Sequence, residues 1–485
     1  MRVRALESND DDTGKMPVLL RGCPMRRRDF LRAAGTSLTL SPLAWGAGGE
    51  AGIVKPLPKQ ARWQDFELGL VHHFDLDVYT PGGHHHERSR RQLLDPTLYR
   101  PAKYDMDQWL EAAKLAGAGY AVLTATHHQG FLQWQSDVYP FGLKQIGWRD
   151  GKADLVRDFV ESCQRYGIAP GVYIGIRFNA YWQVYNYEVN GGKGGDPAKR
   201  ERYMRVCEQI VEELCSRYGP WCEVWFDGGV LTPEQGGPDV LPIVEKYQPQ
   251  AVFYHSQDCA QHRWAGNEAG TAGYPCWATM PDIGSQIRAH KDPRKRMSLL
   301  RHGDPDGKVW CPAMADAPIR EHDWLWIPDR ADRLQPLDKL VNMYYESIGR
   351  NANLILGAVP NMDGLIPEPD FERYAELGRE IRRRFAKPVA QTDGRGAVLA
   401  LDLPSPARVD HVIVMEDIRQ GERIRKYVVE GLVGGDAWQP LCEGISIGHK
   451  RIQQFEPVEV GKLRLRVTES IAEPIIRRLA AYCVA

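Results

Sequence analysis

An aspartate at the end of an apolar segment is the first residue in this chain whose type and position suit chemistry. Asp227 closes the run Trp225-Phe226-Asp227 and precedes Gly228-Gly229. Side chains alternate along a strand, so Trp225 and Asp227 share one face. In barrels of parallel strands, active sites form at the carboxyl ends of the strands, where Asp227 would lie. An aspartate before two glycines also suits an Asx turn or a helix cap, and both interpretations stay open here.

A second carboxyl, Glu268, ends the segment Arg263-Trp-Ala-Gly-Asn-Glu268. A glutamate between small residues, beside Arg and Trp, suits a general acid that gives a proton to a leaving group. Solvent-exposed loop glutamates are commoner than catalytic ones, so the position alone does not decide its role.

Two adjacent histidines, His127 and His128, follow the apolar run 120–126. Imidazoles at a strand end can donate hydrogen bonds to hydroxyls or bind a metal. Adjacent residues on one strand would turn their rings to opposite sides. No further ligands with matching spacing are evident, so we predict no metal site and no cofactor. The run 84–86, three consecutive histidines, is expected in an exposed loop. The glycine-rich segment 191–195 lacks the spacing of a phosphate-binding loop and is predicted to be a surface loop.

Short apolar runs alternate with amphipathic stretches from about residue 60 to 386, which is typical of repeated strand–helix units. This alternation predicts an α/β fold, a (β/α)₈-like barrel with insertions. The region 260–335 is rich in loop residues, and its elements are not resolved by pattern. We expect strands at 66–74, 120–126, 169–176, 222–227, 251–255 and 353–359, with helices at 154–167, 198–218, 337–347 and 371–385, and one capped by Asp105 with Gln108.

The pattern changes after a linker that contains Lys387-Pro388 and Gly394-Arg-Gly396. Short strands between turn signals follow, at 398–403, 411–416, 427–430 and 463–467. In the last, residues 463, 465 and 467 are apolar and alternate with Arg464 and Arg466, as in a half-buried strand. We predict a small C-terminal β-sandwich over 397–485, after a catalytic barrel over 60–386.

The composition is that of an ordinary globular protein with balanced charge. The chain has 485 residues, 62 of them basic and 63 acidic, for a formal net charge of −1. This balance argues against a nucleic-acid surface or a polybasic membrane patch. No apolar run is long enough to span a bilayer. The ten cysteines form no C-x-x-C pair, so neither a thiolate zinc site nor a redox dithiol is predicted.

The N-terminal segment 1–47 has the character of an export signal. Arg27-Arg28 precede Phe30 and Leu31, and the moderately apolar stretch that follows ends in small residues. A charged region, an apolar region and a small-residue site form a signal peptide, and the twin arginines indicate the twin-arginine route. We expect a periplasmic or extracellular protein. A chance Arg-Arg in a disordered tail is the alternative.

Together these motifs resemble glycoside hydrolase family 29, the retaining α-L-fucosidases, and most closely its α-1,3/1,4-fucosidase branch. The similarity covers nearly everything after residue 60 and places several long motifs in the family's order. The C-terminal segments 416–421 and 447–451 look like the galactose-binding-like sandwich of that branch. The motifs are Gly69-Leu-Val-His-His73-Phe74, the segment 123–131, Glu223-Val-Trp-Phe-Asp227-Gly228, Arg263-Trp-Ala-Gly-Asn-Glu268-Ala-Gly and Ser347-Ile-Gly-Arg-Asn-Ala-Asn353.

The resemblance implies a role for each matching residue. Asp227 would be the nucleophile and Glu268 the acid/base of a double displacement that removes α-L-fucose from fucosylated oligosaccharides or glycoconjugates. Fucose carries a C6 methyl, which suits an aromatic wall that Trp225, Phe131 or Trp134 could supply. The residues expected to hold the fucose ring are His73, His127, His128, Trp225, Arg263 and, as a weaker match, Tyr173.

Some positions depart from the family pattern, and they concern the sugar pocket. Thr126 and Gln129 replace the usual Lys and Asp around the histidine pair, Met314 stands where Glu is common, and Gly357 replaces a usual Asn. The family's Glu-Trp sugar-binding pair is not recognisable between residues 75 and 91. A catalytically silent carbohydrate-binding protein on the same scaffold is therefore the alternative hypothesis.

Overall fold

The computed structural model describes residues 52–80, 83, 86–189, 196–256, 260–281, 292–434 and 437–484. The signal expected at 1–47 lies outside these residues, as do His84, His85 and the glycine-rich loop 191–195. The chain from Trp45 to Ala485 forms one compact unit, within which the boundaries of barrel and sandwich stay predictions. Among the described helices, none combines the length and the apolar character needed to cross a bilayer.

An eight-stranded parallel sheet forms the centre of the first part of the chain, in the order β7-β6-β3-β2-β1-β12-β11-β8. The segment just before β8 meets the other end strand, β7, through a backbone hydrogen bond of 3.0 Å from the N–H of Gln261 to the carbonyl of Phe253. The predicted (β/α)₈-like barrel is confirmed. The strands are β1 (Leu68–His72), β2 (Tyr120–Thr126), β3 (Ala169–Ile174), β6 (Glu223–Val230), β7 (Val252–Ser256), β8 (Arg263–Trp264), β11 (Ala313–Pro318) and β12 (Ala352–Ala358).

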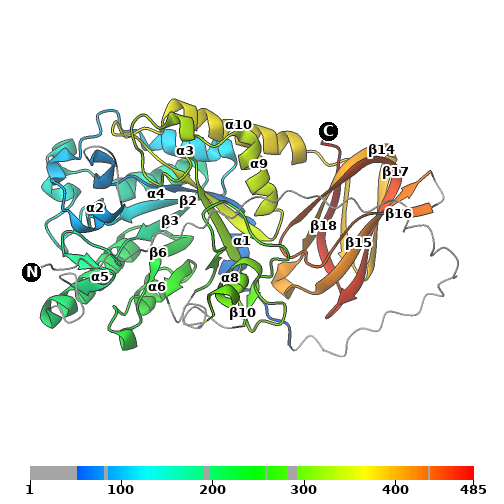
Figure 1. Ribbon diagram of the computed structural model, residues 1–485, viewed down its shortest axis with the longest axis horizontal. Helices are drawn as coiled ribbons and strands as arrows, with labels where there is room; N and C mark the ends of the chain where they lie inside the picture. Colours follow the sequence, from blue (N-terminus) through cyan, green and yellow to red (C-terminus); the bar gives the residue numbers. More distant parts are fainter. Residues whose placement is uncertain are drawn as a thin grey trace, which may run out of the picture. The chain divides into compact units, whose positions relative to one another are not determined.

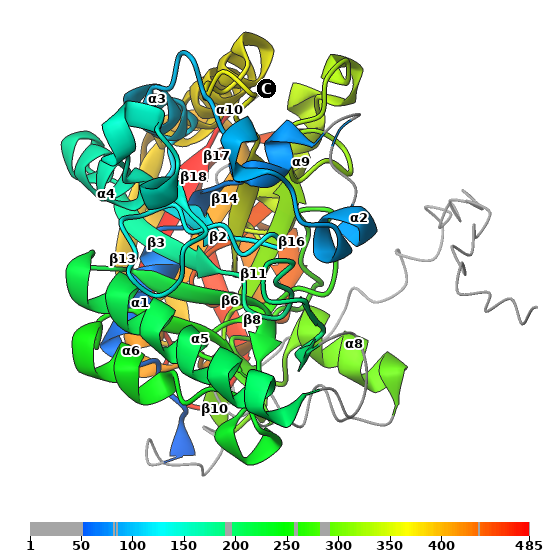
Figure 2. The ribbon, with the colours of Figure 1, turned by 90° about the vertical axis from the view of Figure 1, so that its left-hand side faces the viewer.

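Helices cover the outside of this sheet, and in Figure 2 the strands β2, β3 and β6 lie inside a ring that includes α3, α4, α5 and α6. Asp105 caps α3 as predicted, by accepting hydrogen bonds from the backbone N–H groups of Asp107 and Gln108. The helices are α1 (Pro58–Asp65), α2 (His86–Arg91), α3 (Met106–Ala116), α4 (Leu155–Tyr166), α5 (Pro197–Arg217), α6 (Leu241–Tyr247), α8 (Pro293–His302), α9 (Leu337–Glu346) and α10 (Glu368–Phe385).

The barrel strands are buried on both faces, as expected for parallel strands covered by helices. All seven residues of β2 and all seven of β12 are buried. The barrel interior holds its own apolar cluster, which includes Tyr173, Trp225 and Met314. Trp63 of α1 belongs to the same cluster, and its indole N–H donates to Glu223 at the start of β6. Helix α1 therefore packs at the amino ends of the strands, opposite the end where a barrel site forms.

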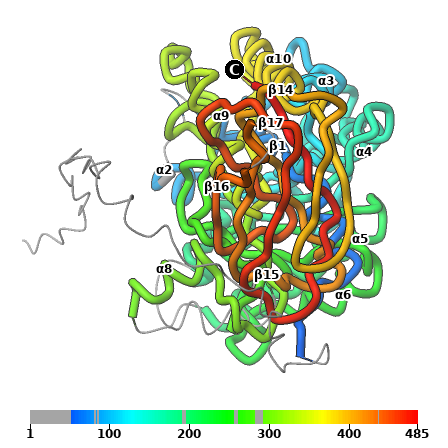
Figure 3. The backbone as a smooth tube through the Cα atoms, turned by 90° about the vertical axis from the view of Figure 1, so that its right-hand side faces the viewer, coloured from blue at the N-terminus to red at the C-terminus, as the bar shows by residue number. Residues whose placement is uncertain are grey.

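The C-terminal part is a separate β-structure with its own apolar core (Figure 1). Its six antiparallel strands lie in the order β13-β18-β14-β17-β15-β16. Figure 3 shows the two longest strands, β14 and β17, side by side, and the expected strands at 398–403 and 411–416 are both parts of β14. The strands are β13 (Ala390–Arg395), β14 (Val398–Glu416), β15 (Ile424–Val433), β16 (Ala437–Gly444), β17 (Arg451–Ser470) and β18 (Ile475–Tyr482).

The alternation predicted at 463–467 is confirmed within β17. Leu463, Leu465 and Val467 are buried in the C-terminal core. Arg464 and Arg466 instead form ion pairs with Glu430 on the neighbouring strand β15. The eight cysteines among the described residues all carry free thiols.

Candidate active site

A cavity of about 650 Å³ opens at the carboxyl ends of β6, β8 and β11. It contains the two carboxyls that the sequence analysis singled out, together with a third, and aromatic side chains form much of its wall. The residues around it are Arg177, Trp225, Asp227, Gly228, Tyr254, Ala260, His262, Arg263, Trp264, Glu268, Arg296, Met297, Leu300, Cys311 and Asp316.

Asp227 lies within β6, which continues to Val230, so it does not cap a helix. Its side chain is solvent-accessible in the cavity. Tyr173 of the adjacent strand β3 pairs in register with Trp225, and its hydroxyl is close enough to Asp227 to interact with it electrostatically. Burial raises the pKa of Tyr173 well above its usual value, and the charge of Asp227 adds to that effect. Tyr173 therefore remains protonated and can donate to the Asp227 carboxylate.

Glu268 lies in the loop after β8, exposed to solvent and facing the same cavity. The indole N–H of Trp324 donates to its Oε2 over 2.9 Å. The ring of Trp324 lies 5.3 Å from the ring of His73, and the ring of Tyr173 lies 5.8 Å from it on another side. The donor beside each acid thus packs against one histidine at the end of β1. This shared contact brings Asp227 and Glu268, 41 positions apart in the chain, to one site.

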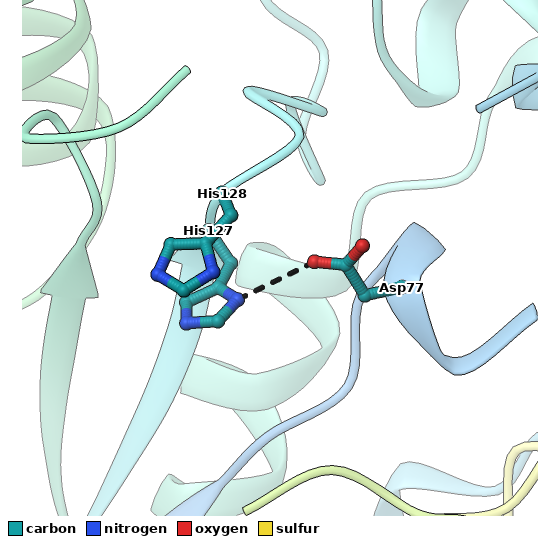
Figure 4. Close-up of side chains that lie close together, drawn as sticks. All are labelled: Asp77, His127 and His128. Carbon is teal, nitrogen blue, oxygen red and sulfur yellow. Dashed lines mark ion pairs between the residues drawn. The ribbon is translucent and has the colours of Figure 1, made fainter. Parts of the chain in front are cut away.

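The histidine pair extends this site beyond the end of β2. His127 and His128 are buried, and their rings stack with centroids 3.9 Å apart and planes inclined by 23° (Figure 4). His127 also packs against His73 and Tyr173, with centroids 6.0 and 5.7 Å away. The prediction that the two rings face opposite sides is wrong, because β2 ends at Thr126 and strand alternation stops there.

Comparison with known proteins decides the family. The model of one family, described as Alpha-L-fucosidase, matches residues 59–383. The chain belongs to the alpha-L-fucosidase family. The predicted resemblance to glycoside hydrolase family 29 is thereby confirmed, whereas membership of its α-1,3/1,4 branch stays a prediction.

Individual members of the fucosidase family match over most of this chain. An Oryza sativa protein provisionally named alpha-L-fucosidase 1 is 30% identical over 468 residues, 87% of this chain and 84% of its own. A crystal structure of a Bacteroides thetaiotaomicron protein, provisionally named an alpha-L-fucosidase, is 47% identical with a TM-score of 0.86, and the match covers 89% of this chain and 100% of that one. A Ruminococcus gnavus family 29 fucosidase solved with fucose shares the fold, with a TM-score of 0.74 at 23% identity, over 91% of this chain and 97% of that one.

A carboxylate that the sequence analysis did not connect to the histidine pair lies beside it. Asp77 places Oδ2 3.5 Å from Nδ1 of His127, and Figure 4 shows this contact. The hydroxyl of Ser89 in α2 donates to the same oxygen over 2.7 Å and lies 3.5 Å from Nδ1 of His128. One aspartate and one serine therefore face the Nδ1 atoms of both rings.

The ligand atoms of Asp77, His127 and His128 lie within 4.8 Å of one another, which is a set of residue types that can hold a metal ion. An imidazole binds a metal in the plane of its ring. Two rings stacked 3.9 Å apart and inclined by 23° have planes that meet only far from either ring. One ion cannot lie in both planes, so the geometry favours a hydrogen-bonding role for this cluster in the fucosidase site.

The departures from the family pattern have structural counterparts. Gln129 is fully buried and accepts a hydrogen bond from the backbone N–H of Leu94, while its amide donates to the carbonyls of Ser89 and Gln92. It therefore anchors the segment that carries Ser89. Met314 fills the barrel interior below the cavity.

Two residues predicted to hold the sugar have other roles in the structure. The guanidinium of Arg263 is buried and donates to the backbone carbonyls of Leu300, Trp277 and Cys311, so most of its donors fix the cavity wall, and its contact with the sugar stays a prediction. Trp134 lies in the outer core between strands and helices, where its N–H donates to Glu213 of α5. The sequence around Trp134 does not reveal whether its ring faces the cavity or the outer core, because that depends on tertiary packing.

Besides Asp77 and Ser89, the sequence analysis missed the roles of Trp264, Asp316 and Trp324 in the site. Asp316 and Trp264 lie on β11 and β8, inside the region whose elements were not resolved by pattern. Trp324 lies in the loop after β11. The only available signal was the alternation of Met314 and Asp316 along one short segment, which places both on one face of a strand.

Proposed function

We propose that this chain is an exo-acting retaining α-L-fucosidase with Asp227 as nucleophile and Glu268 as acid/base. The observation that carries the proposal is the convergence of these two carboxyls on one cavity, each beside an aromatic donor that packs against His73. Its substrates are fucosylated oligosaccharides or glycoconjugates. The fucose bound to the Ruminococcus gnavus protein of the same fold supports this choice of sugar.

The first step forms a covalent intermediate. The Asp227 carboxylate attacks the anomeric carbon of fucose while Glu268 gives its proton to the leaving oxygen, so the glycosidic bond breaks and the aglycone departs as an alcohol. The Tyr173 hydroxyl, whose pKa the charge of Asp227 raises, is proposed to donate to the attacking carboxylate and orient it. The accessible position of Glu268 suits a group that must meet a departing glycan at the cavity mouth.

The second step releases the sugar. Glu268, now a carboxylate, takes a proton from water, and the resulting oxygen nucleophile attacks the fucosyl-aspartate. Asp227 leaves as a carboxylate, and the product keeps the α configuration. His73, His127 and His128 are proposed to bind the fucose hydroxyls, and the ring of Trp225 to contact the apolar face with the C6 methyl.

The nucleophile is tested by Asp227→Gly, with release of 4-nitrophenol from the aryl α-L-fucoside as the assay. We expect turnover to fall by about 10³-fold or more. Azide should restore part of it, since a small anion can occupy the space of the lost carboxylate. Asp402→Gly, at an exposed aspartate of the C-terminal sheet, is the matched control and should retain activity.

Two results would contradict this proposal. An Asp227→Gly enzyme with normal turnover would remove the nucleophile assignment. Tight fucoside binding by the unaltered protein in calorimetry, without any hydrolysis, would instead support the silent carbohydrate-binding alternative.

A further inference from the structure

A third carboxyl, Asp316, shares the cavity with Asp227 and Glu268 and has no part in the two steps above. It lies on β11, two residues after Met314, so both side chains point to the same face of the strand. Met314 belongs to the apolar cluster of the barrel interior. Asp316 therefore also points inward, and only 6% of its surface is exposed.

Asp316 contacts the loop of Glu268 at both of its ends. Its side-chain Oδ1 accepts a hydrogen bond of 2.7 Å from the indole N–H of Trp264, four residues before Glu268. Its backbone carbonyl accepts a hydrogen bond of 2.8 Å from the N–H of Gly270, two residues after Glu268. The intervening segment carries the proposed acid/base. One residue of a rigid barrel strand thus fixes the start and the end of this segment.

The protonation state of Asp316 fits this position. Burial raises its pKa well above the usual value for an aspartate. The hydrogen bond from Trp264 opposes this shift, but the neighbouring charges of Glu268 and Asp227 raise the pKa further. These effects favour the protonated form of Asp316, which can accept from Trp264 through its carbonyl oxygen, over a third negative charge in a cavity that already contains two carboxyls.

We propose that Asp316 is the positioning residue of the acid/base: through Trp264 and Gly270 it holds the Glu268 loop where Glu268 can protonate the leaving oxygen. This inference rests on the proposed function and deepens it. A general acid displaced by about 1 Å can lose on the order of 100-fold in rate, because proton transfer needs close heavy-atom contact. Asp316 acts through the loop, and no contact with substrate is required of it.

The dependence on the leaving group separates this role from a general defect of folding or binding. Hydrolysis of an oligosaccharide needs protonation of a poor leaving group, whereas the fluoride of α-L-fucosyl fluoride departs with little help. Loss of a correctly placed acid should therefore lower kcat/KM, which reports the first step, for the oligosaccharide and largely spare kcat/KM for the fluoride. The second step, in which Glu268 acts as base, is common to both substrates and does not enter kcat/KM. A collapsed cavity would slow both substrates alike.

The decisive variants are Asp316→Leu and Asp316→Asn, compared with Glu268→Ala. Leucine removes the acceptor for Trp264. We expect kcat/KM, which reports the first step alone, to fall about 10- to 100-fold on a fucosylated oligosaccharide and to change less than about threefold on fucosyl fluoride. Asparagine keeps a neutral acceptor of the same size, so it should retain kcat/KM on both substrates within about threefold. Trp264→Phe removes the donor of the same hydrogen bond and should show the pattern expected for Asp316→Leu. It therefore tests the inference even if Asp316→Leu folds poorly.

The outcomes distinguish the inference from the proposed function. If Glu268→Ala itself shows no dependence on the leaving group, the acid/base assignment fails. Suppose that Glu268→Ala shows the dependence on the leaving group. The positioning role is then wrong if Asp316→Leu and Trp264→Phe impair hydrolysis of both substrates equally, or impair hydrolysis of neither. Equal impairment of Asp316→Asn and Asp316→Leu would also overturn it, since a neutral acceptor would then be insufficient.

Discussion

Single side chains beside the site contact the groups that are proposed to bind the sugar. Asp77 is fully buried and places one oxygen near both Ser89 and His127. A carboxylate near Nδ1 of a histidine favours the tautomer with the proton on that nitrogen, and at 3.5 Å the contact of Asp77 with His127 is electrostatic. The family's Glu-Trp pair was not recognisable in this stretch of the sequence. Asp77 and Ser89 occupy it and supply a polar support of a different kind.

Replacing Asp77 by alanine should therefore weaken the site without touching the acid/base. We expect kcat/KM to fall about tenfold or more, through KM and to a similar extent on fucosyl fluoride and on oligosaccharides, because the orientation of His127 serves binding of the fucose itself. Steady-state kinetics on both substrates check this. Ser89→Ala removes only the hydroxyl contact and should have a smaller effect. Unchanged KM in Asp77→Ala would show that the rings are held by stacking alone.

At the scale of elements, strand β12 sets the place of Trp324. A Cβ atom added to Gly357 would lie 2.8 Å from Cζ3 of the Trp324 ring, closer than van der Waals contact allows. The glycine that departs from the family's usual Asn therefore leaves room for the indole that donates to Glu268. The glycine at position 357 of β12 and the position of Trp324 beside Glu268 therefore depend on each other.

Gly357→Ala should push Trp324 away and disturb Glu268. We expect oligosaccharide hydrolysis to fall by about tenfold and the free energy of unfolding to fall by about 1–3 kcal/mol, the usual cost of overpacking a core. Kinetics and thermal unfolding measure the two effects. Gly461→Ala is the matched control, because a Cβ at Gly461 in β17 meets no atom within 4 Å. Normal activity of Gly357→Ala would mean that the contact between Trp324 and Glu268 is dispensable.

Elements also differ in how well the sequence predicted them. The strands β2 and β12 are continuous apolar runs, and the apolar runs of β1, β3, β6 and β7 were recognised in the same way. In contrast, β8 has two residues, and β11 reads Ala-Met-Ala-Asp-Ala-Pro, with little local preference for a strand. Pairing with β12 places β11, and such a long-range contact leaves no local pattern.

The same limit applies to the site. Asp227 and Glu268 were predicted because they stand in long motifs. The stacked histidine rings depend on where β2 ends, and the bonds of Trp264 and Trp324 join segments about 50 residues apart. Side-chain partners of this kind are decided by tertiary packing, which spacing along a single sequence does not reveal.

At the scale of the whole described molecule, the barrel and the C-terminal sheet are joined by two carboxylates, Glu67, which is partly buried, and Glu422, which is buried. Glu67 accepts hydrogen bonds from Nε2 of His449, 3.0 Å away, and from Nζ of Lys450. Glu422 accepts from the backbone N–H of Ala278 and from the amide of Asn351. These contacts reach the barrel at the start of β1 and near the loop after β8.

The two glutamates predict opposite effects of pH on stability. Burial alone would raise the pKa of Glu67, but the charge of Lys450 and the bond from His449 lower it to about 2. The folded state then binds fewer protons than the unfolded one, so the stabilisation by Glu67 is complete above pH 4.5 and is lost as the pH falls toward 2. Burial, followed by the charge of Glu416, raises the pKa of Glu422 to about 7. Glu422 binds more protons in the folded state than in the unfolded state, so its contribution to the free energy of unfolding decreases as the pH rises from 4.5 to 7.

Thermal unfolding of Glu422→Gln and Glu67→Gln across pH 3–8 tests these signs. Glutamine resembles the protonated form of Glu422, so the variant should gain stability relative to the unaltered protein between pH 5 and 7, by about 1–3 kcal/mol. Glu67→Gln should be less stable than the unaltered protein at pH 7, and the difference should shrink below pH 4. Parallel curves for Glu422→Gln and the unaltered protein would contradict the raised pKa.

The position of Glu67 limits how the two halves of this molecule can be recombined. Glu67 directly precedes Leu68, the first residue of β1, and the other end of that strand leads to His73. A chimaera that grafts a foreign carbohydrate-binding module after residue 386 would leave this partly buried anion without its cations, at the opposite end of the strand from His73, a proposed sugar contact. Modular engineering of this hydrolase must therefore transplant His449 and Lys450 with any replacement sheet, or first neutralise Glu67.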